Sequence, residues 1–305
     1  MKPFIPPRWL LFAGGGMRGV AYVGALERLQ AAGGLRCIRG VAGVSIGALI
    51  ALLYALDYSI PQMKEIALGL DFSQLQHVDE ETVFSITENY GIDDGAAVRS
   101  WLEGLLAARA LRAGATFADL KDRWVIDLRV YACRLRDAAT VEFSARRTPT
   151  IPIVDALMAS IAVPLYFAPV RIGGDLYVDG GITDNYPMAH FSAAEQRTIL
   201  GFVFKKDLAM FYKNATESFL SYGTHLIRVM GHDRYKGQIQ HYRDATVLVD
   251  CGAMGVLDFQ MGTEAKEALL GAGRRAVEAW LSGASGSGAA AGSAKKPARR
   301  RWSIS

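Results

Sequence analysis

Long hydrophobic runs are missing from this chain of 305 residues. Its most apolar segment, Val41–Leu56, contains Ser45 and falls short of the roughly 18 consecutive apolar residues that indicate a membrane span. The apolar stretch Trp9–Ala13 is shorter than the core of about 7–15 residues that a signal peptide needs. We therefore expect an intracellular, cytoplasmic protein whose contact with any membrane is peripheral.

Cysteine is scarce as well. The three cysteines, Cys37, Cys133 and Cys251, lie far apart, so the sequence has neither a disulfide framework nor a CxxC metal site. No segment has the spacing of an EF-hand calcium loop. The chain therefore fits a reducing compartment, and we expect no metal ion.

Acidic residues are absent from the end of the chain. None follows Glu278, whereas five of the last eleven residues are basic, and removing these five from the formal net charge of +4 leaves 4 − 5 = −1. The body is therefore near neutral, and we expect no nucleic-acid partner. The cluster fits an anionic membrane surface, a nuclear-targeting or nucleic-acid patch, or a solvated end without function, and we favour the last. It consists of Lys295, Lys296, Arg299, Arg300 and Arg301.

The composition is that of a folded protein. With 51% hydrophobic and 21% charged residues it excludes a disordered chain, a collagen and a coiled coil. We expect residues 1–281 to form a single domain and the Gly-, Ala- and Ser-rich residues 282–305 to form a flexible tail. Two strands joined through a helix open the domain and predict a parallel sheet, an α/β fold. The predicted elements are strands Trp9–Ala13 and Cys37–Ala42 and helices Gly19–Ala32 and Ala48–Leu56.

The rest of the chain continues the α/β pattern. Residues 61–120 are predicted to be mostly helical, with polar loops at 79–81 and 91–95. Thr150 is expected to cap a helix that ends before Pro164. The other predicted strands are Trp124–Leu135, Thr140–Ser144, Leu165–Ile172, Leu176–Val178, Thr198–Phe204 and Ala245–Asp250, and the other helices run from about Thr216 to Met230 and from Asp258 to Leu281.

The segment Gly43–Gly47 has the pattern G-x-S-x-G between a predicted strand and a predicted helix. Such a turn needs small residues on both sides of the serine, because it holds the Ser45 backbone in a strained conformation and lifts the hydroxyl toward a substrate. The following helix N-terminus favours a developing oxyanion. The alternative is a glycine-rich turn in which Ser45 only caps the helix.

A second glycine-rich loop, Gly14–Gly19, also lies between a strand and a helix. Consecutive glycines let successive N–H groups converge on a negative oxygen. The same residues satisfy G-x-G-x-x-G, so dinucleotide binding is an alternative, and that fold places an acidic residue at the end of the second strand. Here the strand ends in Val44 and Ser45, although Arg36 or Arg39 could serve a phosphorylated ribose.

A serine hydrolase also needs a base, which is usually a histidine. None of the five histidines follows a predicted strand in a catalytic context: two lie in predicted helices and two in a charged connection. They are His77, His190, His225, His232 and His241.

Asp179 is the alternative base, because it stands at a strand end and is followed by Gly180 and Gly181. A carboxylate has an ordinary pKa near 4, so it can serve a serine only when partly desolvated or when the hydroxyl is already polarised. Read alone, Asp-Gly-Gly is also typical of a hairpin turn.

Taken together, the motifs resemble the patatin-like phospholipase family in four places and in the same order. These are the glycine-rich loop with its basic residue, the nucleophile turn, an A-S-x-A-x-P segment at Ala159–Pro164 and the D-G-G of the aspartate. Asn185-Tyr186-Pro187 resembles the N-x-P that often follows. The resemblance spans about Leu10 to Phe204. An ordinary α/β-hydrolase does not fit. In that fold several strands precede the nucleophile turn, whereas in this chain only one predicted strand precedes the strand that leads to Ser45.

The resemblance implies a three-layer α/β/α fold with a mostly parallel sheet and a nucleophile elbow. It implies a Ser45–Asp179 dyad without histidine, an oxyanion hole at Gly14, Gly15 and Gly16, and no metal or cofactor. The expected reaction is hydrolysis of fatty acyl esters of phospholipids or lysophospholipids, with acylglycerols as an alternative substrate class. A non-catalytic lipid-binding protein on the same fold is the other alternative.

Three further assignments stay open at this stage. Arg18 is assigned to substrate binding at an anionic head group, and pinning the loop through a carboxylate fits it equally. Ser160 is expected to pack tightly beneath the site rather than act as a second nucleophile. Five apolar residues are expected either to form a lid or an acyl pocket or to be part of the core. They are Met63, Leu68, Leu70, Phe72 and Phe84.

Overall fold

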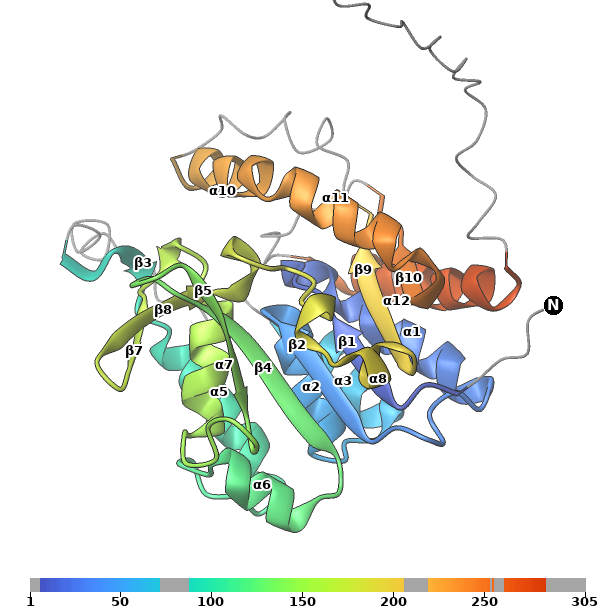
Figure 1. Ribbon diagram of the computed structural model, residues 1–305, viewed down its shortest axis with the longest axis horizontal. Coiled ribbons are helices and arrows are strands. Elements are labelled where there is room, and N and C mark those ends of the chain that lie inside the picture. The colour runs from blue at the N-terminus through green and yellow to red at the C-terminus, as the bar shows by residue number, and fades with distance from the viewer. Residues whose placement is uncertain (1–5, 72–87, 206–218, 253, 255–260, 284–305) are drawn as a thin grey trace, which may run out of the picture.

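The structure is a computed structural model that describes residues 6–71, 88–205, 219–252, 254 and 261–283. Its centre is an eight-stranded sheet with the order β10-β9-β1-β2-β4-β8-β7, in which β5 also pairs with β4 (Figure 1). Five strands run parallel: β1 (Trp9–Phe12), β2 (Gly40–Val44), β4 (Asp127–Arg134), β9 (Ile199–Phe204) and β10 (Thr246–Val249). Three run antiparallel to their neighbours: β5 (Ala139–Ser144), β7 (Val170–Ile172) and β8 (Asp175–Asp179).

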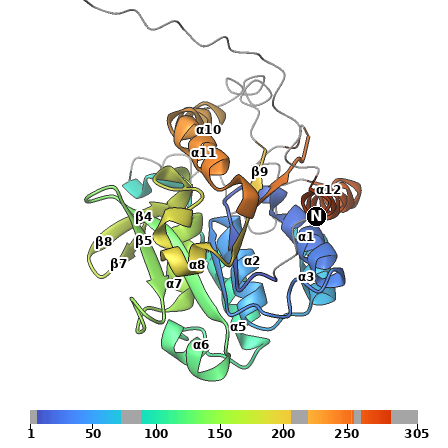
Figure 2. The same ribbon diagram turned by 45° about the vertical axis from the view of Figure 1, so that its right-hand side comes forward.

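Both faces of this sheet are covered, which makes three layers. Along β1, Leu10 and Phe12 enter one core, and Trp9 and Leu11 enter the other, as strand alternation requires. The larger core lies under α1 (Val20–Ala31), α2 (Ile46–Ala55), α3 (Ile60–Gly69), α5 (Ala96–Ala107), α7 (Ile153–Ile161) and α12 (Thr263–Leu281). The smaller lies under η4 (Met188–His190) and α11 (His232–His241), close to α8 (Ala193–Gln196) (Figure 2). The predicted three-layer α/β/α class is confirmed.

Shorter elements complete the fold. A second sheet pairs β3 (Gly91–Asp93) with β6 (Leu165–Phe167). The remaining helices are α6 (Phe117–Arg123), α10 (Phe219–Met230), η1 (Gly16–Gly19), η3 (Gly180–Ile182) and η5 (Arg243–Ala245). Among the described residues, no helix is long and apolar enough to cross a membrane.

The first and last helices are in backbone contact. A Cβ added to Gly24 of α1 would lie closer than 3.0 Å to the carbonyl oxygen of Leu270, and one added to Gly273 of α12 would be equally close to that of Ala21. Glycine is therefore required on both helices at this crossing. Since α1 follows directly on the glycine-rich loop, α12 holds the helix that carries the loop.

Four sequence expectations are corrected by the structure. Residues 91–95 are not only a loop, because Gly91–Asp93 pairs with the distant β6. The single strand predicted over Leu165–Ile172 is divided into β6 and β7 at Ala168-Pro169, where proline lacks an N–H. The helix predicted from Thr150 has Pro152 as its N-cap. His232 and His241 bound a helix, α11, rather than a charged connection.

Other predicted segments fall where nothing is described. The loop at 79–81, the first residues of the helix predicted from Thr216, the stretch from Asp258 to 260 and the tail from 284 lie outside the described residues.

Candidate active site

Two strand ends meet at the centre of the sheet. Strand β2 pairs with the first half of β4, ending with Val44 opposite Tyr131, and β8 pairs antiparallel with the second half, ending with Asp179 opposite Ala132. Because β5 occupies the other edge of β4, β2 and β8 lie along the same edge with their carboxyl ends facing each other. Ser45 follows Val44 directly. The topology therefore brings Ser45 and Asp179, far apart in the sequence, to neighbouring positions.

The turn around Ser45 is strained and depends on its glycines. Ser45 has φ 54° and ψ −129°, a conformation that residues with a side chain rarely adopt, and it is the N-cap of α2. A Cβ on Gly43 would lie closer than 3.0 Å to the carbonyl of Gly47, and one on Gly47 would be equally close to the carbonyl of Phe12. The spacing G-x-S-x-G thus follows from backbone contacts on both sides of the serine, whose residue surface is 9% exposed.

Ser160 anchors this turn to the sheet. Its hydroxyl accepts a hydrogen bond from the Ser45 N–H at 2.9 Å and donates one to the carbonyl of Tyr131 at 2.7 Å. The side chain is completely buried. The expected packing role of Ser160 is therefore realised as a hydrogen-bonded link between α7, β4 and the nucleophile turn, a geometry that its sequence motif alone did not indicate.

Asp179 is held by its own loop. Its Oδ1 accepts a hydrogen bond from the Gly181 N–H at 2.7 Å, and its backbone N–H donates to the carbonyl of Ala162 at 2.8 Å. The residue is 7% exposed. A Cβ on Gly181 would lie 2.9 Å from Asp179 Oδ1 and 2.8 Å from Asn185 Oδ1, so the glycine leaves room for both side chains. The carboxylate is consequently both partly desolvated and fixed in orientation.

The glycine-rich loop lies against Ser45. A Cβ on Gly14 would be 3.1 Å from Ser45 Cβ and 2.5 Å from Asn185 Oδ1. Asn185 Nδ2 donates a hydrogen bond to the Gly14 carbonyl at 3.1 Å. Since a trans peptide points its N–H away from its C=O, this bond fixes the direction of the Gly15 N–H. Sequence reasoning quoted Asn185 only as part of a motif and missed this contact.

Arg18 lies beneath the loop rather than on the surface. It is 3% exposed, its Nε donates to the Gly15 carbonyl at 3.3 Å, and its guanidinium carbon lies 4.8 Å from the centre of the Phe204 ring. Burial lowers the pKa of the guanidinium. The bond to Gly15 fixes the next peptide, and so the direction of the Gly16 N–H, by the same geometry. These contacts favour a loop-pinning role through a carbonyl, while binding of a head group stays a prediction.

Two of the described histidines, His190 and His241, contact side chains away from Ser45. His190 Nε2 lies 3.8 Å from Asp184 Oδ2, and its ring meets that of Tyr131 edge-on. The ring of His241 packs against Tyr242. His225 belongs to α10, and His77 lies outside the described residues. In the ranges that the structure describes, no three His, Cys, Asp or Glu side chains form a group that could hold a metal ion.

An apolar pocket adjoins the nucleophile turn. It spans about 380 Å³ of space between atoms, part of which is open solvent. Ile46, next to Ser45, and Met17, within the glycine-rich loop, both line it, so the pocket adjoins the site. Met63 and Leu70 line it, and Met63 also belongs to the core, against which Leu68 packs. The other two residues of that group, Phe72 and Phe84, lie outside the described residues. The other lining residues are Gly19, Val20, Leu49, Ile50, Leu53, Ile66, Ala67 and Trp101.

Known proteins are similar to this chain in sequence or fold. The model of the patatin-like phospholipase family matches residues 10–191. An uncharacterized protein of Acanthamoeba polyphaga mimivirus is 27% identical over 277 residues, 88% of this chain and 92% of that protein. Among solved structures, VipD from Legionella pneumophila aligns with a TM-score of 0.62 at 16% identity, over 92% of this chain and 67% of its own, and therefore shares the fold.

Two relatives carry names that describe an activity. A probable lipid hydrolase, 463L, of Invertebrate iridescent virus 6 is 27% identical over 181 residues, 59% of this chain and 61% of the viral protein. Lysophospholipase NTE1 of Candida albicans is 27% identical over 185 residues, 59% of this chain and 12% of that protein. With the family match covering more than half of the chain and the sheet, turn and loops in place, the chain belongs to the patatin-like phospholipase family of lipid hydrolases.

Proposed function

We propose that this protein is a serine esterase that cleaves fatty acyl esters of phospholipids or lysophospholipids with a Ser45–Asp179 dyad. The observation that carries the proposal is the meeting of β2 and β8 on one edge of β4, which makes the strained serine and the carboxylate neighbours. Membership of a family of lipid hydrolases supports an ester of a lipid as substrate.

The reaction proceeds in two acyl transfers. Ser45 Oγ attacks the ester carbonyl carbon while the carboxylate of Asp179 accepts the hydroxyl proton. The N–H groups of Gly14, Gly15 and Gly16 stabilise the oxyanion, and the fixed directions of the Gly15 and Gly16 groups avoid reorganisation during the step. The bond to the lipid alcohol then breaks, and Asp179 returns the proton to the leaving oxygen. Water repeats the sequence on the acyl-enzyme, releasing the fatty acid and restoring Ser45.

The acyl chain is assigned to the apolar pocket that begins at Ile46. Its described lining residues carry no charge, and α5 contributes Trp101 to them. Each methylene moved from water into such a pocket contributes about 0.8 kcal/mol. Chain length should therefore affect kcat/KM strongly, and long-chain esters should be preferred over short ones until the pocket is full.

A neutral acylglycerol is the second candidate substrate. The observation that favours it is the burial of Arg18, the one basic residue that the motifs suggest for a head group. With that guanidinium pinned to Gly15, hydrolysis on this dyad does not require a phosphate. Dinucleotide binding has no such support. A dinucleotide-binding fold needs an acidic residue where this chain has Ser45, and the glycine-rich loop lies against Ser45.

The domain and its location are part of the same proposal. Residues 1–281 act as one catalytic domain, and 282–305 are a tail outside it. The cysteines Cys37, Cys133 and Cys251 are all free, which suits a reducing, cytoplasmic setting. The enzyme meets its lipid at a membrane surface without crossing it.

A labelling experiment tests the dyad. A fluorophosphonate probe should modify the wild-type protein and leave Ser45→Ala unmodified, since the probe reports an activated serine. Labelling of both proteins, or of neither, contradicts the proposal. The substrate class is then decided by assaying phosphatidylcholine, lysophosphatidylcholine and triacylglycerol side by side, with positional analysis of the products.

A further inference from the structure

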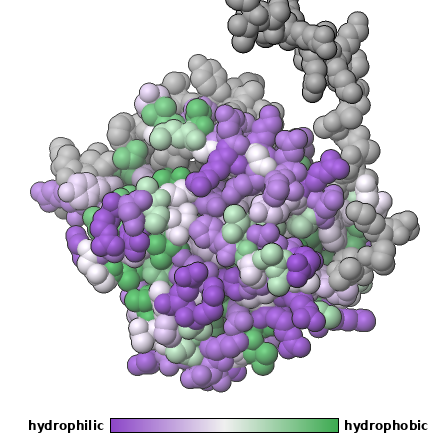
Figure 3. Space-filling view, in the orientation of Figure 1, coloured by the Kyte–Doolittle hydropathy of each residue, from purple (hydrophilic) through white to green (hydrophobic). Residues whose placement is uncertain are grey.

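Helix α10 carries a group of exposed apolar side chains. Tyr222, Leu226, Val229 and Met230 are 52%, 43%, 47% and 85% exposed. The other large apolar side chains that are exposed in the described ranges lie on separate elements, and single ones of this kind are normal on protein surfaces. Figure 3 shows the hydrophobic group over α10, at the upper left of that view.

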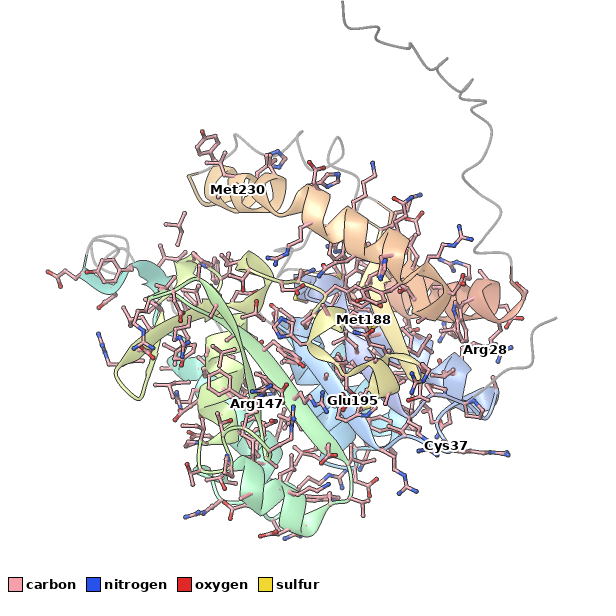
Figure 4. All side chains as sticks on the ribbon, in the orientation of Figure 1. Arg28, Cys37, Arg147, Met188, Glu195 and Met230 are labelled. Carbon is pink, nitrogen blue, oxygen red and sulfur yellow. The ribbon has the colours of Figure 1, made fainter. Side chains whose placement is uncertain are left out.

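The four residues occupy one face of the helix. Because an α-helix turns by about 100° per residue, the four positions fall within an arc of about 100° and form a single stripe. Gly223, whose added Cβ would lie closer than 3.0 Å to the side chain of Leu165 on β6, marks a point where the helix meets the rest of the protein. The four apolar side chains are nevertheless exposed, and Met230 lies at the end of the helix (Figure 4).

This face belongs to the side of the molecule that holds the candidate active site. On the next helix, Arg234 Nη1 donates to the carbonyl of Thr183, and Gln238 Nε2 donates to Asp184 Oδ1 at 2.9 Å. Both acceptors follow Asp179 in the same loop. Figures 1 and 2 show α10 and α11 together across the carboxyl ends of the central strands.

The charge next to the stripe is positive. Helix α10 contains no acidic residue, and the first turns of α11 expose Arg234 and Lys236 against one acid, Asp233. An apolar stripe flanked by basic residues is typical of a helix that lies in the head-group region of an anionic bilayer.

We propose that the outer face of α10, formed by Tyr222, Leu226, Val229 and Met230, docks on the surface of an anionic phospholipid membrane and presents the carboxyl ends of β2 and β8 to the lipid. This inference rests on the proposed function. A bilayer is the occupant that fits, because the substrate itself resides there, the face is apolar with a basic margin, and it lies on the side of the site.

Vesicle sedimentation tests the proposal with a protein that cannot consume the vesicles. The full-length Ser45→Ala chain should bind vesicles of equal parts phosphatidylglycerol and phosphatidylcholine. Adding Leu226→Glu and Met230→Glu should raise the lipid concentration for half-maximal binding at least about tenfold. The matched control adds Val125→Glu and Leu248→Glu, which are 71% and 42% exposed on other elements, and should bind like the parent.

Several outcomes overturn the proposal. These are no binding by the parent, equal binding by the α10 variant, or an equal loss in the control. A parent that is dimeric by light scattering, with an α10 variant that is monomeric, would show that the face joins two copies of the chain instead.

If the introduced charges lower the thermal midpoint, Val229→Ser with Met230→Ser is the milder variant. It should raise the lipid concentration for half-maximal binding about threefold. Ester hydrolysis by the wild type is measured separately. A wild type without ester hydrolysis would contradict the proposed function and would leave the vesicle result to decide the docking face.

Discussion

The carboxyl edge of the central sheet and the outer face of α10 depart from the usual distribution of side chains in opposite directions. At the edge, polar or charged residues are buried: Ser45, Asp179, Ser160 and Arg18 are 9%, 7%, 0% and 3% exposed. On α10, Met230 is 85% exposed. Burying polar groups and exposing apolar ones both cost stability unless something compensates. At the edge the compensation is a set of hydrogen bonds within the chain, whereas on α10 it would come from a lipid.

The largest expected effect comes from removing the proposed base at the carboxyl edge of the sheet. Asp179→Asn keeps the size of the side chain and its acceptor for Gly181, but it is not a base at neutral pH. We expect kcat on a phospholipid to fall at least about 10⁴-fold. The thermal midpoint should stay near that of the wild type, which shows that the protein is folded. Ser45→Ala should fall as far, and the double variant no further, because the two residues act as a unit. Full activity of Asp179→Asn would mean that another group is the base.

A second change tests whether the edge depends on backbone contact. Gly43→Ala places a Cβ closer than 3.0 Å to the carbonyl of Gly47, so the turn must shift. We expect a loss of about 3 kcal/mol or more in the free energy of unfolding. Gly104→Ala is the control, because nothing lies within 4 Å of a Cβ there and the position is inside α5. It should raise stability by about 0.5–1 kcal/mol in the same denaturant titration. Equal effects at the two positions would contradict the steric account.

A third change concerns the direction of the Gly15 N–H. Asn185→Asp keeps the shape of the side chain but removes the donor to the Gly14 carbonyl. We expect kcat to fall about 10–100-fold with KM nearly unchanged, since an oxyanion donor acts in the transition state. A rise in KM at constant kcat would point to substrate binding instead, and an unchanged kcat would show that the loop holds its direction without Asn185.

The smallest expected effect concerns Glu195, a carboxylate away from the candidate site, whose hydrogen bonds stabilise the fold. Burial raises the pKa of Glu195, but hydrogen bonds from Arg129 and Ser192 outweigh it, so the pKa lies below its usual value near 4.3. This contribution is complete above the unfolded pKa and is lost as pH falls through the folded one. The thermal midpoint of the wild type should therefore drop below about pH 4, and Glu195→Gln should show a shallower decline. Parallel curves for the two proteins would contradict this.

Local patterns in the sequence were sufficient to predict much of the edge. The opening strand–helix–strand unit, the turn at Ser45 and the glycine-rich loop each consist of consecutive residues whose conformation depends on small side chains. Each is found in the predicted order, although the second strand is Gly40–Val44 rather than Cys37–Ala42 and residues 16–19 of the loop form a short 3-10 helix. The general α/β class followed from the same unit, because two parallel strands require a crossover and helices on the sheet.

Contacts between distant segments were not predictable in this way. Nothing in the residues near Ser160 indicates that its hydroxyl bridges Ser45 and Tyr131, and nothing near Asn185 indicates Gly14 as its partner. The pairing of β3 with β6 is of the same kind. The outward stripe of α10 also depends on where the helix packs, since an amphipathic pattern does not say whether its apolar side meets a core or the solvent.

The crossing of α1 and α12 has a consequence for synthesis of the chain. The ribosome completes the glycine-rich loop and α1 before α12, and the surface against which Gly24 packs is supplied by residues 263–281, far downstream in the chain. Until then, α1 lacks its largest neighbouring helix, and the oxyanion loop at its start lacks a firm support. A nascent chain would thus carry its nucleophile well before α12 completes the framework for hydrolysis.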